Sequence, residues 1–259
     1  MTKPMIGAQL YTLRAHTKTM PDIAATLKKV AAIGYKTVQV SGFGPADPKD
    51  VARAAGDCGL RIVSTHTAWG RFREKLDDVI AEHKLWRCPH PAIGGLSMEY
   101  YCADGVKRFL DELAPIAEKL GREGMDFSYH NHRHELIKFG SKNWLEQVYD
   151  NSSPSTLKAE IDVYWIAAGG GDPAWWVRRS KGRIPLLHCK DMTLIRTGDK
   201  CEQRFAEVGE GNLNWPAILK EAEECGVEYL LVEQDDCYGK DPFEALALSY
   251  RNLAGWGYK

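Results

Sequence analysis

The chain has 259 residues, of which 44% are hydrophobic and 27% are charged, and its formal net charge at pH 7 is −1. This length can bury a sizeable core, and α/β barrels reach it as one domain. Because positive and negative side chains nearly cancel, we do not expect nucleic acid or an anionic membrane as a partner. No apolar run approaches the length of a membrane span.

The N-terminus and the cysteines together predict a cytoplasmic protein. Residues Met1 to Met5 lack the basic segment and the apolar run of a signal peptide. The seven cysteines are scattered, and no two of them have the Cys-x-x-Cys spacing. An odd number of scattered cysteines indicates reduced thiols rather than a disulfide framework.

An amphipathic helix, a glycine and a β-rich run follow one another repeatedly along the chain. Glycine after a helix end supplies the left-handed cap that turns the chain into a strand. The pattern occurs at Gly34 before 36–40, Gly59 before 61–65, Gly121 before 125–130 and Gly226 before 228–233.

In chain order, the periodicity predicts eight strands and eight helices. The strands are expected near 5–10, 36–40, 61–66, 90–94, 125–131, 157–162, 184–190 and 228–233, and the helices near 21–33, 47–58, 71–85, 105–120, 142–150, 173–181, 214–225 and 242–254. Eight alternating pairs predict a closed (β/α)₈ TIM barrel, one α/β domain over 1–259, rather than an open sheet. The runs Gly169–Gly171 and Thr193–Asn214 are expected to be loops, the second long enough to cover a pocket.

Polar residues gather where the predicted strands end. These residues are Gln9, His66, His130, His132, Asp162, His188, Lys190 and Glu233. Active sites of such barrels form at the C-terminal ends of the strands. If these residues only packed in the protein core, each charge would need a partner, because an unpaired buried charge is costly. A shared metal ion supplies such a partner. Imidazole and carboxylate ligands together suit Mn²⁺, Zn²⁺, Co²⁺ or Fe²⁺ rather than a calcium cage.

The densest polar stretch is Tyr129-His-Asn-His-Arg-His-Glu135. Side chains alternate along a strand, so His130 and His132 are expected to share one face. Imidazole is both a common metal ligand and a general acid or base near neutral pH. His134 lies further into the loop and is expected to be an ordinary surface residue.

Seven motifs in this order resemble the xylose-isomerase-like TIM-barrel superfamily, in its sugar phosphate isomerase/epimerase group. They are Gly7–Arg14, Val63–His66, Tyr129–His132, Ile161–Tyr164, His188–Asp191, Val208–Gly211 and Val232–Asp235. The resemblance implies one divalent metal ion, with Mn²⁺ as the first expectation and Zn²⁺, Co²⁺, Mg²⁺ or Fe²⁺ as alternatives. Carried over by position, its ligands are His130, Asp162, His188 and Glu233. The fifth-strand ligand of that superfamily is usually a glutamate, and here a histidine stands at that place.

The remaining site residues are expectations about catalysis and substrate binding. Glu233, His132 and Lys190 are the candidate catalytic residues. The candidate substrate contacts are Gln9, His66, Glu135, Trp165 and Arg204. Because the fifth-strand glutamate is missing, either His132, Glu135 or Glu160 replaces it as a base, or the reaction needs only one base. Two of these have simpler interpretations: Glu135 as a surface residue, and Glu160 as a partner of Lys158.

The preferred function is a divalent-metal-dependent sugar, keto-sugar or cyclitol isomerase or epimerase, which abstracts an α-proton and forms an enediolate. The alternative is a lyase or dehydratase that acts on a keto-sugar, a keto-glycoside or an inosose. An abasic-site endonuclease is disfavoured because phosphate binding requires basic charge, and a non-catalytic sugar-binding barrel because the strand ends keep their ligands. The expected partner is a small sugar, and the oligomeric state is left open, a homo-oligomer included.

Overall fold

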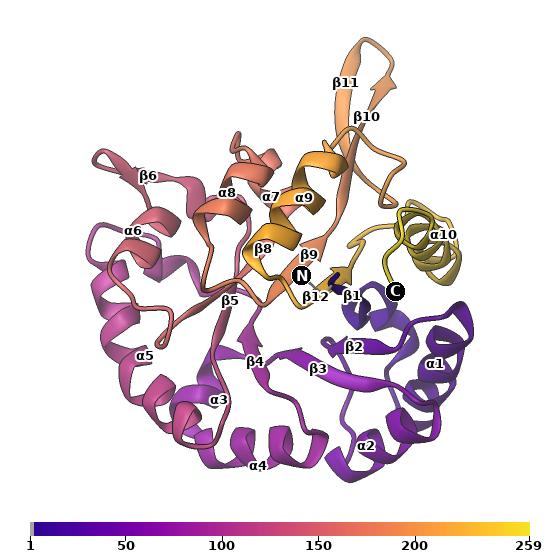
Figure 1. Ribbon diagram of the computed structural model, residues 1–259, viewed down its shortest axis with the longest axis horizontal. Helices are drawn as coiled ribbons and strands as arrows, with labels where there is room; N and C mark the ends of the chain where they lie inside the picture. Colours follow the sequence, from indigo (N-terminus) through magenta and orange to yellow (C-terminus); the bar gives the residue numbers. More distant parts are fainter. Residues whose placement is uncertain (1–2) are drawn as a thin grey trace.

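The computed structural model describes residues 3–259. Met1 and Thr2, which begin the segment in which no signal peptide is expected, lie outside the described residues. Eight parallel strands close into a barrel in the order β1-β12-β9-β8-β5-β4-β3-β2 (Figure 1). They are β1 (Met5–Gln9), β2 (Thr37–Val40), β3 (Arg61–His66), β4 (His90–Ile93), β5 (Ser128–His130), β8 (Lys158–Asp162), β9 (Leu186–Cys189) and β12 (Tyr229–Val232). The predicted single-domain (β/α)₈ barrel is confirmed.

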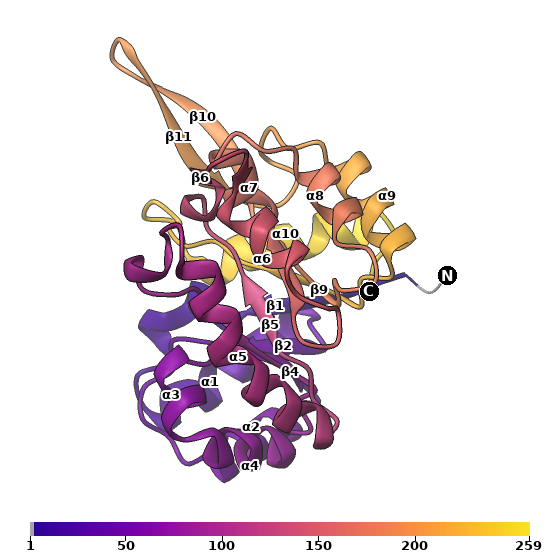
Figure 2. The same ribbon diagram turned by 90° about the vertical axis from the view of Figure 1, so that its left-hand side faces the viewer.

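Helices surround the barrel on its outer side (Figures 1 and 2). They are α1 (Met20–Ile33), α2 (Pro48–Asp57), α3 (Trp69–Glu74), α4 (Leu76–Trp86), α5 (Gly105–Arg122), α6 (Trp144–Asp150), α7 (Val163–Ala168), α8 (Pro173–Arg179), α9 (Trp215–Cys225) and α10 (Pro242–Gly255). Three short 3₁₀ helices are η1 (Leu10–His16), η2 (Met98–Tyr100) and η3 (His134–Leu136). Within residues 3–259, no helix has both the length and the apolar character that crossing a membrane requires.

The helix boundaries differ from the prediction at three places. The helix expected to stop at Gly121 continues to Arg122, and the left-handed residue is Gly124, with φ of +74°. The helix expected over 71–85 is divided into α3 and α4 by Lys75, whose φ of −139° is not helical. Helix α7 was not predicted; it begins directly after β8 because the Asp162 side chain accepts from the backbone N of Trp165 and caps its N-terminus.

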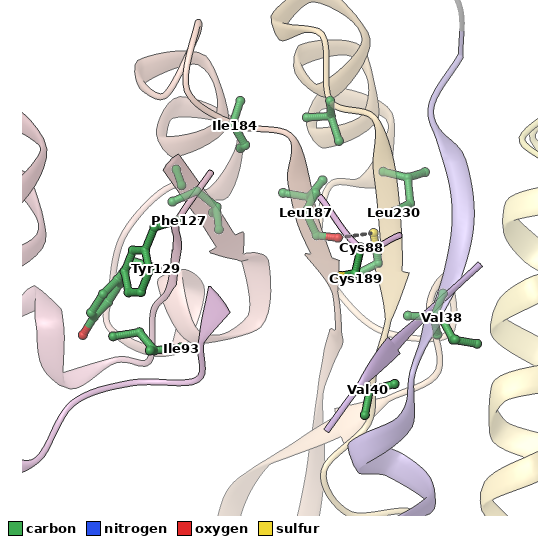
Figure 3. Close-up of a cluster of buried hydrophobic side chains, with 14 of the residues drawn as sticks. Val38, Val40, Cys88, Ile93, Phe127, Tyr129, Ile184, Leu187, Cys189 and Leu230 are labelled. Atoms are coloured by element: carbon green, nitrogen blue, oxygen red, sulfur yellow. Dashed lines mark hydrogen bonds between the residues drawn. The ribbon is translucent and has the colours of Figure 1, made fainter. Parts of the chain in front are cut away.

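Side chains of the barrel strands alternate between an outer apolar shell and the barrel interior. Val38, Leu187 and Leu230 belong to the large cluster packed between strands and helices (Figure 3). A separate small cluster contains Val63, Leu186 and Leu231. Because inward positions follow at every second residue, Leu186 is followed by His188 in β9 and by Lys190 directly after it, which places polar groups above this apolar cluster.

The segment Thr193–Asn214, predicted as a loop, mostly forms an antiparallel hairpin of β10 (Asp191–Thr197) and β11 (Lys200–Ala206). It projects from the barrel on the side away from the two termini (Figures 1 and 2). Thr197 pairs with Lys200, so the turn is the two-residue loop Gly198-Asp199, with φ of +62° at Gly198. Gly-Asp between two β-rich runs is a known hairpin signal. The loop prediction was wrong because the flanking runs are too polar to show a buried face. A second short hairpin joins β6 (Lys138–Phe139) and β7 (Lys142–Asn143).

His90 begins β4, and we expect it to make stability depend on pH. Its Nδ1 lies 2.9 Å from Asp126 Oδ1, and its Nε2 lies 3.8 Å from Glu228 Oε2. Burial alone would lower the pKa of His90, but these two carboxylates outweigh it and raise the pKa from 6.5 to about 9. The stabilisation is therefore complete below pH 6.5 and is lost as pH rises through about 9.

Replacing His90 by Gln should consequently lower the free energy of unfolding by about 2–3 kcal/mol more at about pH 6 than at about pH 10. Urea denaturation of both proteins at the two pH values measures this difference. An equal loss at both pH values would mean that His90 stabilises β4 by packing rather than by charge.

Candidate metal centre and active site

Four residues from four strand ends meet at the C-terminal end of the barrel. His130 closes β5, Asp162 closes β8, His188 lies in β9 and Glu233 follows β12. All four are buried, and one ligand atom of each lies within 4.8 Å of the others. His130 Nε2 is 3.2 Å from Asp162 Oδ2, and His188 Nδ1 is 3.1 Å from Glu233 Oε2 and 3.8 Å from Asp162 Oδ2. The ligand set expected from the sequence is thus brought together.

Lys190 lies against the same two carboxylate oxygens. Its Nζ is 3.0 Å from Asp162 Oδ2 and 2.8 Å from Glu233 Oε2. A third carboxylate, Asp235, accepts from it at 2.7 Å. The side chain is 1% exposed, so Lys190 is a buried cation held by three anions, not the solvated lysine that the sequence left as an alternative.

Glu160 forms a polar layer beneath this group, together with Gln39, His66 and His188. Its Oε2 accepts from His66 Nε2 at 2.9 Å, and its Oε1 accepts from Gln39 Nε2 at 2.6 Å. His188 Nε2 lies 3.1 Å from Glu160 Oε1 and 2.7 Å from Gln39 Oε1. Glu160 therefore does not pair with Lys158; it connects the imidazoles of His66 and His188 inside the barrel.

The hydrogen bonds of His188 determine which of its nitrogens is available as a ligand. Both neighbours of Nε2 are acceptor oxygens, so Nε2 carries a proton and donates it. Nδ1 then faces Glu233 Oε2, and this approach is favourable only if a proton or another cation stands between the two atoms. A carboxylate that holds the far nitrogen of a metal-binding histidine is a common arrangement, because it orients the ring and raises its basicity.

The donor set fits a divalent transition metal. Metal–ligand bonds of about 2.0–2.2 Å place neighbouring donors about 3.0–3.6 Å apart, near the 3.1–3.8 Å separations of this group. A site of two imidazoles and two carboxylates suits Mn²⁺, Fe²⁺, Co²⁺ or Zn²⁺, whereas Mg²⁺ and Ca²⁺ prefer sites built from oxygen ligands alone.

The protonation states of Asp162, Glu233 and His130 also suit ligands. Burial alone would raise the pKa of Asp162, but the Lys190 ammonium outweighs it and lowers the pKa to about 2. Lys190 likewise holds the pKa of Glu233 well below its usual value, against the effect of burial. Burial, with the charge of His188, lowers the pKa of His130 to about 4, which keeps this ring neutral. Ionised carboxylates and a neutral imidazole are the forms that bind metal ions.

An aromatic wall stands beside Lys190. Its Nζ lies 5.5 Å from the ring centre of Trp165 and 5.7 Å from that of Phe205. Phe205, in β11, also packs on Tyr164 with ring centres 4.3 Å apart. The segment Thr193–Asn214 was expected to cover a pocket as a loop. The base of the hairpin does lie beside the site, but it is a strand rather than a loop. His132 packs on Trp165 with ring centres 5.4 Å apart.

The other expected substrate contacts, Gln9, His66, Glu135 and Arg204, lie in three different surroundings. Gln9 is buried, and its Nε2 donates to His66 Nδ1 at 3.2 Å, so both belong to the polar layer around Glu160. Glu135 is fully buried and accepts from Tyr129 Oη at 2.9 Å, so the surface alternative for it was wrong. Arg204 lies in β11, pairs with Glu202 at 3.2 Å and stacks on Tyr238.

Asp191, which ends the His188–Asp191 motif, has a structural task. Its carboxylate accepts from the backbone N of Gly209 at 2.9 Å and of Gly211 at 3.1 Å, and from Trp215 Nε1 at 2.6 Å. A Cβ on Gly211 would come within 2.3 Å of Asp191 Oδ1, so this position accepts only glycine. The two motifs His188–Asp191 and Val208–Gly211 are therefore two halves of one contact, which holds the hairpin ends together.

The fold and the strand-end site both match a known family. Residues 27–251 match the family described as "Xylose isomerase-like TIM barrel". The chain belongs to this family.

Two individual relatives of this xylose isomerase-like barrel share about a quarter of its residues. It is 24% identical to the rhizopine catabolism protein MocC of Rhizobium meliloti over 268 residues, which cover 88% of this chain and 78% of the relative. It superposes on a sugar phosphate isomerase/epimerase from Parabacteroides distasonis with a TM-score of 0.80 and 25% identity, covering 98% of this chain and 94% of the other. An L-ribulose 3-epimerase covers the same shares, 98% and 94%, with a TM-score of 0.73 and 18% identity, and shows the fold alone.

Three residues of this xylose isomerase-like barrel were not expected in the site from the sequence. Gln39 gave no signal, because one glutamine at an inward strand position is indistinguishable from a polar core residue. Asp235 stands in the motif Val232–Asp235, but nothing in the sequence paired it with Lys190. Phe205 was hidden in the predicted loop; recognising the Gly198-Asp199 turn would have placed it at the base of a hairpin.

Proposed function

We propose that this protein is a divalent-metal-dependent isomerase or epimerase that acts on a sugar, a keto-sugar or a cyclitol. The observation that carries the proposal is the buried group His130, Asp162, His188 and Glu233, whose donors come from four separate strand ends. The name of one relative at 25% identity, a sugar phosphate isomerase/epimerase, supports the substrate class. Mn²⁺ is the proposed ion, with Zn²⁺, Co²⁺, Mg²⁺ and Fe²⁺ as alternatives.

When bound, a divalent ion supplies Lewis-acid polarisation of a substrate carbonyl and its neighbouring hydroxyl, which acidifies the α C–H group. Glu233, ionised beside Lys190, takes the α-proton. Lys190 donates from Nζ to the substrate oxygen that becomes negative in the enediolate. His132 lies next to His130, with ring centres 5.0 Å apart, and returns a proton from the loop side. Trp165 and Phe205 pack on the sugar ring and exclude water.

Metal removal and hydrogen exchange test this proposal together. The protein is dialysed against a chelator, reconstituted with Mn²⁺, and incubated with a panel of sugars, keto-sugars and inososes in deuterated water. The expected result is incorporation of deuterium at the α-carbon of one substrate class, only in the reconstituted protein. Full exchange activity in the metal-free protein would contradict the proposal.

A second candidate, a lyase or dehydratase acting on a keto-sugar, a keto-glycoside or an inosose, is favoured by one feature of the site. The proposed base, Glu233, has a proton-carrying group directly beside it, because Lys190 Nζ lies 2.8 Å from Glu233 Oε2. β-Elimination needs one base for the α-proton and one acid for the leaving group, and this pair supplies both. A product that contains an α,β-unsaturated carbonyl, with no epimer formed, would favour this reaction over epimerisation.

Glu160 should control metal affinity without contacting the ion. Replacing Glu160 by Gln removes the charge that holds His188 Nε2 and His66 Nε2. Loss of such a supporting carboxylate weakens metal binding by about 10- to 100-fold. Competition with a chromophoric chelator measures the affinity, and urea denaturation shows whether the fold is retained.

Glu221 provides a matched control, because it is also buried but pairs with Arg178 at 2.8 Å on the outer side of the barrel. Glu221→Gln should lower stability slightly and leave metal affinity unchanged. Equal metal affinities in the wild type and Glu160→Gln would show that Glu160 only fills the barrel interior.

A further inference from the structure

A second group of metal-type donors lies in the loop after β5 and in η3. His132, His134 and Glu135 each offer one ligand atom within 4.8 Å of the other two. His134 Nε2 is 3.5 Å and His132 Nδ1 is 4.0 Å from the same oxygen, Glu135 Oε1. The two imidazole rings lie nearly parallel, at an interplanar angle of 9° with centres 5.3 Å apart. None of these residues belongs to the first metal group.

Both facing nitrogens lack a hydrogen-bond partner. His132 Nδ1 and His134 Nε2 are buried, and neither has a partner among residues 3–259. Buried polar atoms in folded proteins are nearly always paired, so two such atoms directed at one carboxylate call for a bound species between them.

The carboxylate of this group is held in place before any ligand binds. Glu135 is fully buried, and its Oε1 accepts from Tyr129 Oη at 2.9 Å and Tyr101 Oη at 3.1 Å. Its Oε2 accepts from the backbone N of His132 at 2.9 Å. These contacts fix the direction of Glu135, which lowers the cost of assembling a site around it.

We propose that His132 Nδ1, His134 Nε2 and Glu135 Oε1 form a second divalent-cation site. Two imidazoles and one carboxylate favour Zn²⁺ or Co²⁺ over Mg²⁺ or Ca²⁺, and three protein ligands leave coordination positions for water. The donor separations of 3.5 and 4.0 Å exceed those of the first group, so this site is the weaker of the two.

Occupation of this second site should inhibit the enzyme, a consequence that rests on the proposed function. His132 is the proposed proton carrier from the loop side, so its ring must accept a proton before it returns one, and coordination occupies the accepting nitrogen Nδ1. The coordinated imidazole then carries its proton on Nε2 and no longer accepts one. Excess Zn²⁺ is therefore expected to inhibit at concentrations above those that saturate the first site.

Counting bound ions tests the binding proposal independently of activity. The metal-free full chain is titrated with Co²⁺, and stoichiometry by equilibrium dialysis is recorded together with the visible absorption of the ion. The expected numbers are two ions for the wild type, one for His134→Gln, and two for the control His16→Gln, which changes an exposed histidine at the end of η1. One ion in the wild type, or two in His134→Gln, would overturn the second site.

His188→Asn separates the two proposals. One ion in this variant, with the spectrum that His134→Gln loses, supports a loop site that is independent of the first. If the wild type and His134→Gln both bind one ion and His188→Asn binds none, the second site is refuted while the proposed function stands.

In the activity assay, about tenfold relief of Zn²⁺ inhibition in His134→Gln, measured relative to the metal-reconstituted rate of each protein, supports the inhibitory role. Equal relative inhibition in both proteins contradicts it.

Discussion

Glu233→Gln is expected to lower kcat/KM by about 10³-fold, equivalent to about 4 kcal/mol of transition-state stabilisation. The substitution keeps the shape of the side chain but removes its charge. Glu233 Oε2 contacts both His188 Nδ1 and Lys190 Nζ, so the variant loses the proposed base and an anionic ligand at once. The rate of α-proton exchange in deuterated water measures the first loss, and metal content of the dialysed protein measures the second.

Glu244→Gln is the control for this experiment, because Glu244 is an exposed carboxylate in the first turn of α10. It should leave the exchange rate and metal content unchanged. If Glu233→Gln keeps its metal and more than about a tenth of its exchange rate, the proton is moved by another group, and His132 would be the next candidate.

Lys190→Met is expected to lower the free energy of unfolding by about 3–5 kcal/mol in the presence of a chelator, because removing one partner of a buried ion pair leaves the other uncompensated. The wild-type ammonium lies within 3.0 Å of oxygens from Asp162, Glu233 and Asp235. Without it, three clustered carboxylates repel one another. Adding Mn²⁺ should restore part of the loss, since the ion replaces the missing positive charge. Urea denaturation with chelator and with Mn²⁺ measures both values.

Lys220→Met supplies the comparison. Lys220 is 71% exposed and lies 3.8 Å from Glu224 in α9. Such a surface pair contributes about 0–1 kcal/mol, and its loss should not respond to Mn²⁺. A Lys190→Met protein as stable as the wild type in chelator would show that the three carboxylates take up protons instead, which the pH dependence of its stability would reveal.

The resemblance leads one to expect a glutamate at the end of the fifth strand, where this chain has His130, and the structure shows which groups surround this histidine. His130 lies at the end of β5 beside Asp162, while the carboxylate Glu160 lies one layer deeper, bound to His66 and His188. Of the three replacements considered for the missing base, Glu160 is thus occupied by two imidazoles, and Glu135 by two tyrosines. His132 retains a half-exposed ring beside the metal donors. The geometry therefore favours His132 as the second proton carrier.

The amino-acid sequence alone was sufficient to predict the barrel and the gathering of polar residues at its strand ends. Helical periodicity and post-helix glycines show the eight repeats, because each repeat buries one helix face against one strand. Polar side chains at the ends of apolar strands were recognisable because they have few structural explanations, and the resemblance to the xylose-isomerase-like superfamily singled out four of them as expected metal ligands. Parallel strands of one barrel end on the same face, so His130, Asp162, His188 and Glu233 had to converge if the eightfold repeat was correct.

Only the tertiary structure decided which polar groups meet inside the barrel. Pairings such as Glu160 with His66 or Lys190 with Asp235 join residues 94 and 45 positions apart. They depend on strand register and on the closure of the sheet, and local patterns carry no information on either. The same holds for the hairpin. The residues Gly198-Asp199 indicate its turn, but the contact of Phe205 with Trp165 forms only when β11 and α7 come together at the C-terminal end of the barrel. Sequence determines which side chains face inward, and three-dimensional closure determines what each of them touches.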